Sequence, residues 1–210
     1  LIDWVLSATL AVEPTKLIVV LGKFKEMAFH YISRHFPTTF CVEQYEQLGT
    51  GHAVLQAKPL LNDVVGLTLV LAGDSPFITS TTLQLLIHHQ TISDTAATIL
   101  TAETENPFGY GRIIRDDNGG VVGIVEEKDA AQHEKNIKEI NSGVYVFDNT
   151  LLFEALQHIG NHNAQGEYYL TDVIAVLKNK GHKVNAYKTD KFYETIGINT
   201  AEDLESAENL

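Results

Sequence analysis

Apolar and polar residues alternate along the chain in blocks that predict strands and helices in turn. Apolar runs at 16–22, 38–43 and 67–74 predict strands. Between the first two lies an amphipathic stretch, 25–36, that predicts a helix closed by Pro37. The run LTLVLAGD at 67–74 is continuously apolar, as in a parallel strand covered on both faces. This order predicts an α/β fold with a mostly parallel sheet.

The rest of the chain continues the same rhythm with one interruption. Helices are predicted at the start of the chain and at 53–61, 80–90, 149–159 and 170–180, and a last one begins at 199; strands are predicted at 95–103, 139–148, 183–189 and 192–198. The interruption is 106–129, where turn residues separate short apolar runs, and it predicts a β-hairpin insertion. Because the sequence contains no internal repeats or linkers, we expect a single domain over residues 1–210.

Composition and charge narrow the classes of partner. The net charge of −12 argues against a general nucleic-acid or anionic-membrane surface, so we expect neither partner. A polyanionic ligand would need local cations or its own metal. The single cysteine cannot form an internal disulfide, which favours a reducing compartment and a cytoplasmic location. No apolar run approaches the roughly 18 residues of a membrane span.

Polar residues stand where predicted strands end, which is where open α/β sheets bind ligands. Asp74 follows the apolar run LTLVLAG, so its carboxylate either binds a metal or serves a turn. Glu126 follows a hairpin strand and, in isolation, is typical of a solvated charge paired with Lys128. Asn141 fits an Asn-Ser-Gly turn, and Asn199 fits the N-cap of the last helix. Each residue therefore has a structural and a functional interpretation.

Two glycine-rich segments raise the same question. GYGR at 109–112 is either a hairpin bend or a close backbone approach to a ligand, with Arg112 pairing a phosphate. VEQYEQLGTGHAV at 42–54 is either a hinge between two elements or a loop whose backbone touches a ligand. No GxSxG nucleophile elbow and no HExxH zinc motif occurs, so covalent serine chemistry and a zinc site have no support.

The order of the motifs is more specific than any one of them. EQLGTGHAV, LVLAGDSPFI, NPFGYGRII, GIVEEKDA, EINSGVYVF, NAQGEYYLTDVI and ETIGINT occur in this order across 42–205. In order and spacing they resemble the uridyltransferase domains of the bacterial bifunctional N-acetylglucosamine-1-phosphate uridyltransferase/glucosamine-1-phosphate acetyltransferase family. The resemblance implies a Rossmann-like nucleotidyltransferase fold.

The resemblance also implies a role for each matching residue. The uracil-reading segment corresponds to Gln44, Gln47, Gly49 and Thr50. The pair that holds Mg²⁺ corresponds to Asp74 and Asn199, which with Arg112 are the expected catalytic residues. The groups that hold N-acetylglucosamine and ribose correspond to Gly111, Glu126 and Asn141, and the wall around the sugar and its phosphate corresponds to Tyr169 and Thr171.

The reaction implied by the resemblance joins UTP to N-acetylglucosamine 1-phosphate and releases pyrophosphate, with Mg²⁺ as cofactor. Family members begin with a strand and a Gly-rich loop of the type L-A-A-G-x-G-T-R-M that binds the triphosphate, and full-length relatives trimerise through a C-terminal β-helix. Neither segment occurs in these 210 residues. We therefore expect an N-terminally truncated domain with weakened UTP binding and little pyrophosphate release.

Three hypotheses follow from this resemblance. The first is a uridyltransferase domain, the second a UDP-sugar-binding remnant without turnover, and the third a nucleotidyltransferase for another base or sugar phosphate. Product binding without pyrophosphate release distinguishes the second hypothesis, and a panel of nucleoside triphosphates and sugar 1-phosphates distinguishes the third.

Overall fold

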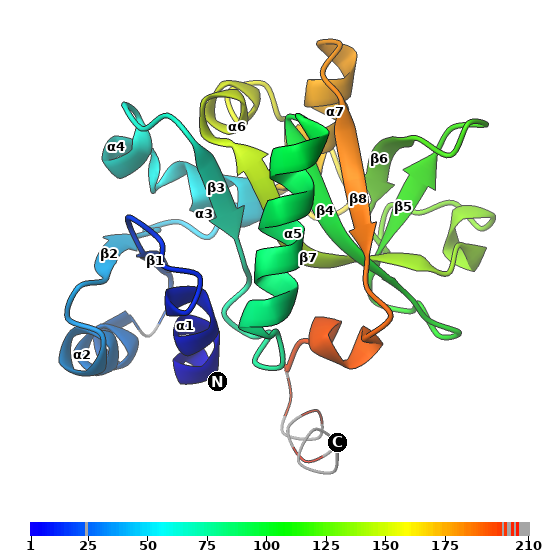
Figure 1. The fold of residues 1–210 in the computed structure, drawn as a ribbon. Coiled ribbons are helices and arrows are strands. Elements are labelled where there is room, and N and C mark those ends of the chain that lie inside the picture. Colours follow the sequence, from blue (N-terminus) through cyan, green and yellow to red (C-terminus); the bar gives the residue numbers. More distant parts are fainter. Residues whose placement is uncertain (24, 199, 201–202, 204, 206–210) are drawn as a thin grey trace.

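The computed structural model describes residues 1–23, 25–198, 200, 203 and 205, which form two sheets and the helices around them (Figure 1). The main sheet has six strands in the order β6-β5-β7-β4-β8, with β3 paired to β7 off this path, and the small sheet has the order β1-β2. The main strands are β3 (Leu67–Val70), β4 (Ala97–Glu103), β5 (Gly111–Arg115), β6 (Val121–Val125), β7 (Glu139–Asp148) and β8 (Val184–Lys188). The small sheet comprises β1 (Ile18–Leu21) and β2 (Phe40–Glu43).

The α/β class is confirmed, but the main sheet is mixed where a mostly parallel sheet was expected. Strands β1 and β2 are parallel, as are β4 and β8. Strand β7 runs antiparallel to β3, β4 and β5, and β5 and β6 form the predicted hairpin. The cause is β7, a ten-residue strand that returns from the hairpin and pairs with three neighbours. Hydrophobicity alone does not specify strand direction.

Helices cover both faces of the main sheet according to the two-residue alternation of its strands. On β7, Val144 and Val146 face the cluster that contains Leu83 and Leu86 of α5 (Ser80–Ser93). The alternate residues Tyr145 and Phe147 face the opposite cluster, which is built with α6 (Asn149–Ala155) and α7 (Asp172–Asn179). Each face of β7 therefore has its own hydrophobic core.

The small sheet lies beside the main sheet, and four helices belong to the described part of the chain before β3 (Figure 1). These are α1 (Ile2–Leu10), α2 (Lys25–His35), α3 (Thr50–Leu55) and α4 (Lys58–Leu61). The helical segment expected at 53–61, with its interruption by Pro59, consists of α3 and α4, and Pro59 lies in the first turn of α4, where a missing N–H is tolerated. Residues 44–49 connect β2 to α3.

One predicted strand is wrong. Residues 192–198 contain the 3₁₀ turn η2 (Phe192–Thr195) instead of a strand. Glu194 within it is completely buried and accepts hydrogen bonds from the Thr79 N–H at 3.3 Å and the Thr79 hydroxyl at 3.1 Å. These bonds attach η2 to the start of α5. No helix within the described residues is long and apolar enough to cross a membrane.

Candidate active site

The loop that follows β2 is attached to a distant loop by backbone hydrogen bonds. Gly51 donates its N–H to the Tyr168 carbonyl at 2.8 Å, and Tyr168 donates its N–H to the Leu48 carbonyl at 2.8 Å. Between them, the Thr50 hydroxyl accepts the Leu170 N–H at 2.9 Å. We call residues 44–50 the base loop. Its position therefore depends on residues 168–170, more than one hundred positions away in the sequence.

Gly49 allows this close approach. Its φ of 111° favours glycine, and a Cβ atom there would lie 2.6 Å from the Tyr168 carbonyl oxygen and 2.8 Å from the Tyr168 nitrogen. Both contacts are shorter than packing permits, and both involve backbone atoms that cannot move aside easily. The hinge interpretation of this segment is therefore incomplete, because the glycine also permits contact between two loops.

The two glutamines of the base loop lie in different environments. Gln44 is buried, and its Nε2 lies 3.0 Å from the Gly49 carbonyl oxygen and 3.0 Å from Nδ1 of His52. Gln47 is exposed and donates to the Gln44 carbonyl at 3.0 Å. Gln44 thus has the more fixed side chain of the two.

A second cluster comprises the residues matched to sugar and ribose binding. Gly111 of β5 is the register partner of Asn141 of β7. A Cβ atom at Gly111 would lie 3.3 Å from Glu126 Oε2, so Glu126, which directly follows β6, reaches across this glycine. The Thr171 hydroxyl donates to Glu126 Oε1 at 2.9 Å. The fold therefore brings together four predicted residues that are far apart in the sequence, and we call them the sugar cluster.

Burial changes the pKa values of ionisable groups in and beside the sugar cluster. Burial raises the pKa of Glu126, with the nearby Asp172 and Asp129 carboxylates adding to the rise, while the hydrogen bond from Thr171 opposes it. Asn141 donates from Nδ2 to the Tyr145 hydroxyl at 2.7 Å, and burial raises the pKa of that phenol. Because burial disfavours the charged form, the Glu126 carboxyl group is stabilised by a hydrogen bond or by protonation.

Tyr169 lies beside the sugar cluster in the chain and is buried. Its hydroxyl accepts a hydrogen bond from Gln165 Nε2 at 2.8 Å, and burial raises the pKa of the phenol. Because Tyr169 lies between Tyr168 and Leu170, which contact the base loop, it forms part of the connection between that loop and the sugar cluster.

Asp74 lines a cavity of about 340 Å³. The cavity is also lined by Ser75, Tyr110, Ser142, Gly197 and Asp203. Tyr110 precedes Gly111 and Ser142 follows Asn141 in the chain, so the segments that line the cavity also carry two residues of the sugar cluster. The Ile198 N–H donates to the Asp74 carbonyl oxygen at 2.8 Å. Asn199, the other predicted metal ligand, lies outside the described residues.

The donor chemistry of this cavity suits a hard divalent cation. Within the described residues, no three His, Cys, Asp or Glu side chains come together as a metal cage. Mg²⁺ does not need one, because it commonly uses one or two carboxylates and completes its shell with water and phosphate oxygens. Asp74 supplies a carboxylate, and Asp203 lines the same cavity. Asp74 therefore fits the expected role.

Arg112 adopts a geometry that differs from the expected phosphate contact. Its guanidinium is buried, donates to the Tyr110 carbonyl and forms an ion pair with Glu127 at 2.6 Å. Glu127 also accepts the Gly109 N–H at 3.3 Å, and the hydrogen bond from Arg112 lowers the pKa of Glu127. In this arrangement Arg112 stabilises the 109–112 turn, and its charge is already neutralised.

Two residues that were not singled out from the sequence connect the predicted ones. Glu194 attaches η2 to Thr79, and η2 leads directly into Gly197 and Ile198 beside Asp74. His52 holds the side chain of Gln44. Both lie within the quoted motifs, His52 in EQLGTGHAV and Glu194 in ETIGINT, but the motifs alone assign neither of them a role.

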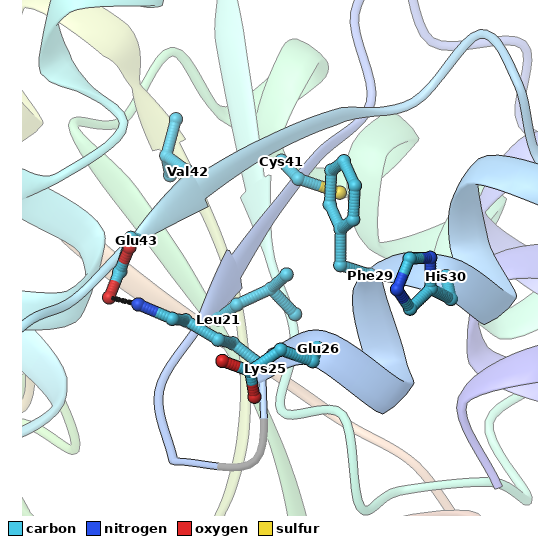
Figure 2. A pocket seen from close by; sticks show the side chains of 8 residues that line it. All are labelled: Leu21, Lys25, Glu26, Phe29, His30, Cys41, Val42 and Glu43. Carbon is cyan, nitrogen blue, oxygen red and sulfur yellow. Dashed lines mark hydrogen bonds and ion pairs between the residues drawn. The ribbon is translucent and has the colours of Figure 1, made fainter.

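A separate apolar pocket of about 290 Å³ lies between α2 and the small sheet and contains none of the predicted residues (Figure 2). Leu21, Phe29, Cys41 and Val42 line it, and Lys25 forms an ion pair with Glu43 at its rim. Burial raises the pKa of the Cys41 thiol, which disfavours the reactive thiolate. The predicted site residues therefore lie outside this pocket.

Sequence comparisons relate the chain to known proteins. A sequence model described as nucleotidyl transferase matches residues 1–207. Over 210 residues the chain is 48% identical to the bifunctional protein GlmU of Streptococcus gordonii, 49% to that of Geobacillus sp. and 47% to that of Streptococcus sanguinis. Each match covers 100% of this chain and 45% of the relative, so the chain spans under half the length of these curated relatives. The chain belongs to the nucleotidyl transferase family.

Proposed function

We propose that the chain transfers UMP from UTP to N-acetylglucosamine 1-phosphate, giving UDP-N-acetylglucosamine and pyrophosphate. One observation carries the proposal: the base loop is hydrogen-bonded to residues 168–170, which lead directly into Thr171 of the sugar cluster. A base reader and a sugar-binding wall are thereby parts of one connected unit, as a nucleotide sugar requires. The sequence resemblance supplies the identity of the sugar and the base.

The reaction needs no protein nucleophile. A phosphate oxygen of the sugar phosphate forms a bond to the α-phosphorus of UTP, and the bond to the bridging oxygen breaks, so pyrophosphate leaves with the electron pair. The attacking oxygen is already anionic near neutral pH, so the protein needs to align two anions and reduce their repulsion.

Each group of residues has a part in this alignment. Gln44 and the backbone of the base loop hold the uracil, while Glu126 and Asn141 bond the hydroxyl groups of the sugar and ribose. Asp74, with Asn199, would hold Mg²⁺, which when bound supplies positive charge to the phosphates. Tyr110 and Ser142, the chain neighbours of Gly111 and Asn141, line the Asp74 cavity, so the proposal places the phosphates between the cavity and the sugar cluster.

A specific observation also supports the second candidate, a UDP-sugar-binding domain without turnover. None of the described residues that line the Asp74 cavity is Lys or Arg, and Arg112 is paired with Glu127. With a net charge of −12, such a site depends on the metal to offset a triphosphate. A diphosphate product carries less charge and would bind more readily.

Two assays on the same preparation test these proposals. Pyrophosphate release is measured with UTP, N-acetylglucosamine 1-phosphate and Mg²⁺, and UDP-N-acetylglucosamine binding is measured by calorimetry. Release that is abolished by Asp74→Ala supports transfer, and binding without release supports the second candidate. Other nucleoside triphosphates and sugar 1-phosphates test specificity. A chain that neither binds nor turns over overturns both proposals.

The longer relatives define a further expectation. Homotrimer formation is implied for full-length family members through a C-terminal β-helix, and the 45% coverage leaves room in them for such a region. Sedimentation of a full-length relative beside this chain would test whether the described residues associate by themselves.

A further inference from the structure

His52 lies beside the one buried side chain of the base loop. Gln44 Nε2 is 3.0 Å from His52 Nδ1 and 3.0 Å from the Gly49 carbonyl oxygen. A carbonyl oxygen can only accept a hydrogen bond, so the contact with Gly49 establishes that the NH₂ end of the amide faces this way. The second N–H of the same nitrogen is then directed to His52.

The opposite end of the Gln44 amide remains available. Its Oε1 has no hydrogen-bond partner among the described residues, and it is not one of the fully enclosed polar atoms that lack a partner. Both amide hydrogens are used internally, so Gln44 offers a ligand an acceptor and no donor.

The ring of His52 accepts at Nδ1 when its proton is on Nε2. Gln56 lies on that other side, with its Nε2 at 3.1 Å from His52 Nε2 and at 3.0 Å from the His52 carbonyl oxygen. A neutral imidazole cannot accept at both nitrogens. Gln44 is buried while Gln56 is half-buried and can turn to water, so the bond to Gln44 is the more costly one to lose.

We infer that His52 is a positioning residue that sets the base preference of the site. This inference rests on the proposed function. By holding the Gln44 amide with its oxygen outward, His52 favours a pyrimidine that presents an N–H at its pairing edge, such as uracil. Cytosine presents a lone pair at the same ring nitrogen and meets an acceptor. Without His52, the amide keeps one anchor and can rotate to present its NH₂ group.

Two substitutions separate the hydrogen bond from the packing. His52→Asn keeps an acceptor oxygen near the position of Nδ1, whereas His52→Leu keeps the bulk and removes the acceptor. We expect wild-type chain to bind UDP more tightly than CDP, His52→Asn to retain most of that ratio, and His52→Leu to reduce it by about tenfold, as expected for one buried hydrogen bond. Equilibrium binding of UDP and CDP, with thermal unfolding of each variant, measures the effect.

The outcomes are distinguishable. A folded His52→Leu chain with the wild-type UDP/CDP ratio overturns the role of His52, whereas a wild-type chain without preference for UDP overturns the proposed function. If His52→Leu does not fold, ¹⁵N spectra of the wild-type imidazole decide the question without ligand. A proton on Nε2 supports the inference, and a proton on Nδ1 overturns it.

Discussion

The main sheet and the small sheet differ sharply in burial, and the candidate site extends over both. In β4, every residue but the last is buried, whereas β1 and β2 contain no buried residue. Among the described residues, the buried apolar side chains before position 76 are Val5, Leu6, Ile32 and Ala57. The sugar cluster belongs to the well-packed region, while the base loop follows a strand of the small sheet.

This contrast indicates how the two halves of the site are held. The sugar cluster is positioned by strand register and two hydrophobic cores. The base loop depends on its hydrogen bonds to residues 168–170. Regions with few buried contacts open at lower free energy than the core. We therefore expect the base loop to exchange its amide hydrogens faster than β4 and β7.

The largest expected effect comes from the main core. Phe147 is completely buried in β7, and Phe147→Ala should lower the free energy of unfolding by about 3–5 kcal/mol. The matched change in the small sheet is Val20→Ala, in a half-buried strand, which should cost about 1 kcal/mol. Urea unfolding compares them, and equal losses would contradict the contrast between the sheets.

The next effect concerns Glu194. Burial acts to raise its pKa, but hydrogen bonds from Thr82, Lys191 and Thr79 outweigh it, so the pKa is lowered. A lowered carboxyl pKa stabilises the fold above the unfolded value near 4.5 and loses that contribution as the pH falls through the folded value. Glu194→Ala should cost about 2–4 kcal/mol near pH 7 and less in acid.

The exposed neighbour Tyr193 provides a control for Glu194. Tyr193→Ala changes the same turn without removing a buried carboxylate and should cost under about 1 kcal/mol. Urea unfolding at neutral and acidic pH compares the two variants. A loss at Glu194 that does not shrink in acid would show that the carboxylate charge is not responsible.

A smaller loss of overall stability, together with local opening of the base loop, is expected for Gly49→Ala. Gly49→Ala adds a clash with the Tyr168 backbone to the cost of a positive φ, whereas Gly166→Ala meets only the φ cost, since nothing lies within 4 Å of a Cβ there. We expect Gly166→Ala to cost about 1 kcal/mol and Gly49→Ala about 1–2 kcal/mol more. Hydrogen exchange should show the base loop opening in Gly49→Ala only. Equal exchange in both variants would show that the clash with Tyr168 does not destabilise the loop.

The smallest effect on stability is expected at Glu126. Because its folded pKa is raised, stability falls as the pH rises from the unfolded value near 4.5 through the folded value, and the cost persists at higher pH. Glu126→Gln keeps an acceptor for Thr171 and should be about 0.5 kcal/mol more stable than wild type at pH 7, with no gain below about pH 4. Thermal unfolding across this pH range checks the sign, and a variant that is less stable at pH 7 would contradict it.

The sequence predicts the elements better than their pairing. Apolar runs identify most strands because burial requires them, but strand direction and the 3₁₀ turn at Glu194 depend on contacts made only in the folded chain. Similarly, the motifs indicate Gly111 and Asn141 separately, and only the β5–β7 register places them opposite each other. Arginine commonly binds phosphate, so the sequence predicts that role for Arg112. The sequence alone does not show that Arg112 pairs with Glu127 instead.

A backbone NMR titration with UDP-N-acetylglucosamine tests whether the base loop and the sugar cluster form one nucleotide-sugar site. We expect the amide signals of residues 44–50, Gly111, Glu126, Asn141 and Thr171 to shift together with one dissociation constant. Shifts confined to one of the two regions, or two different constants, would contradict it.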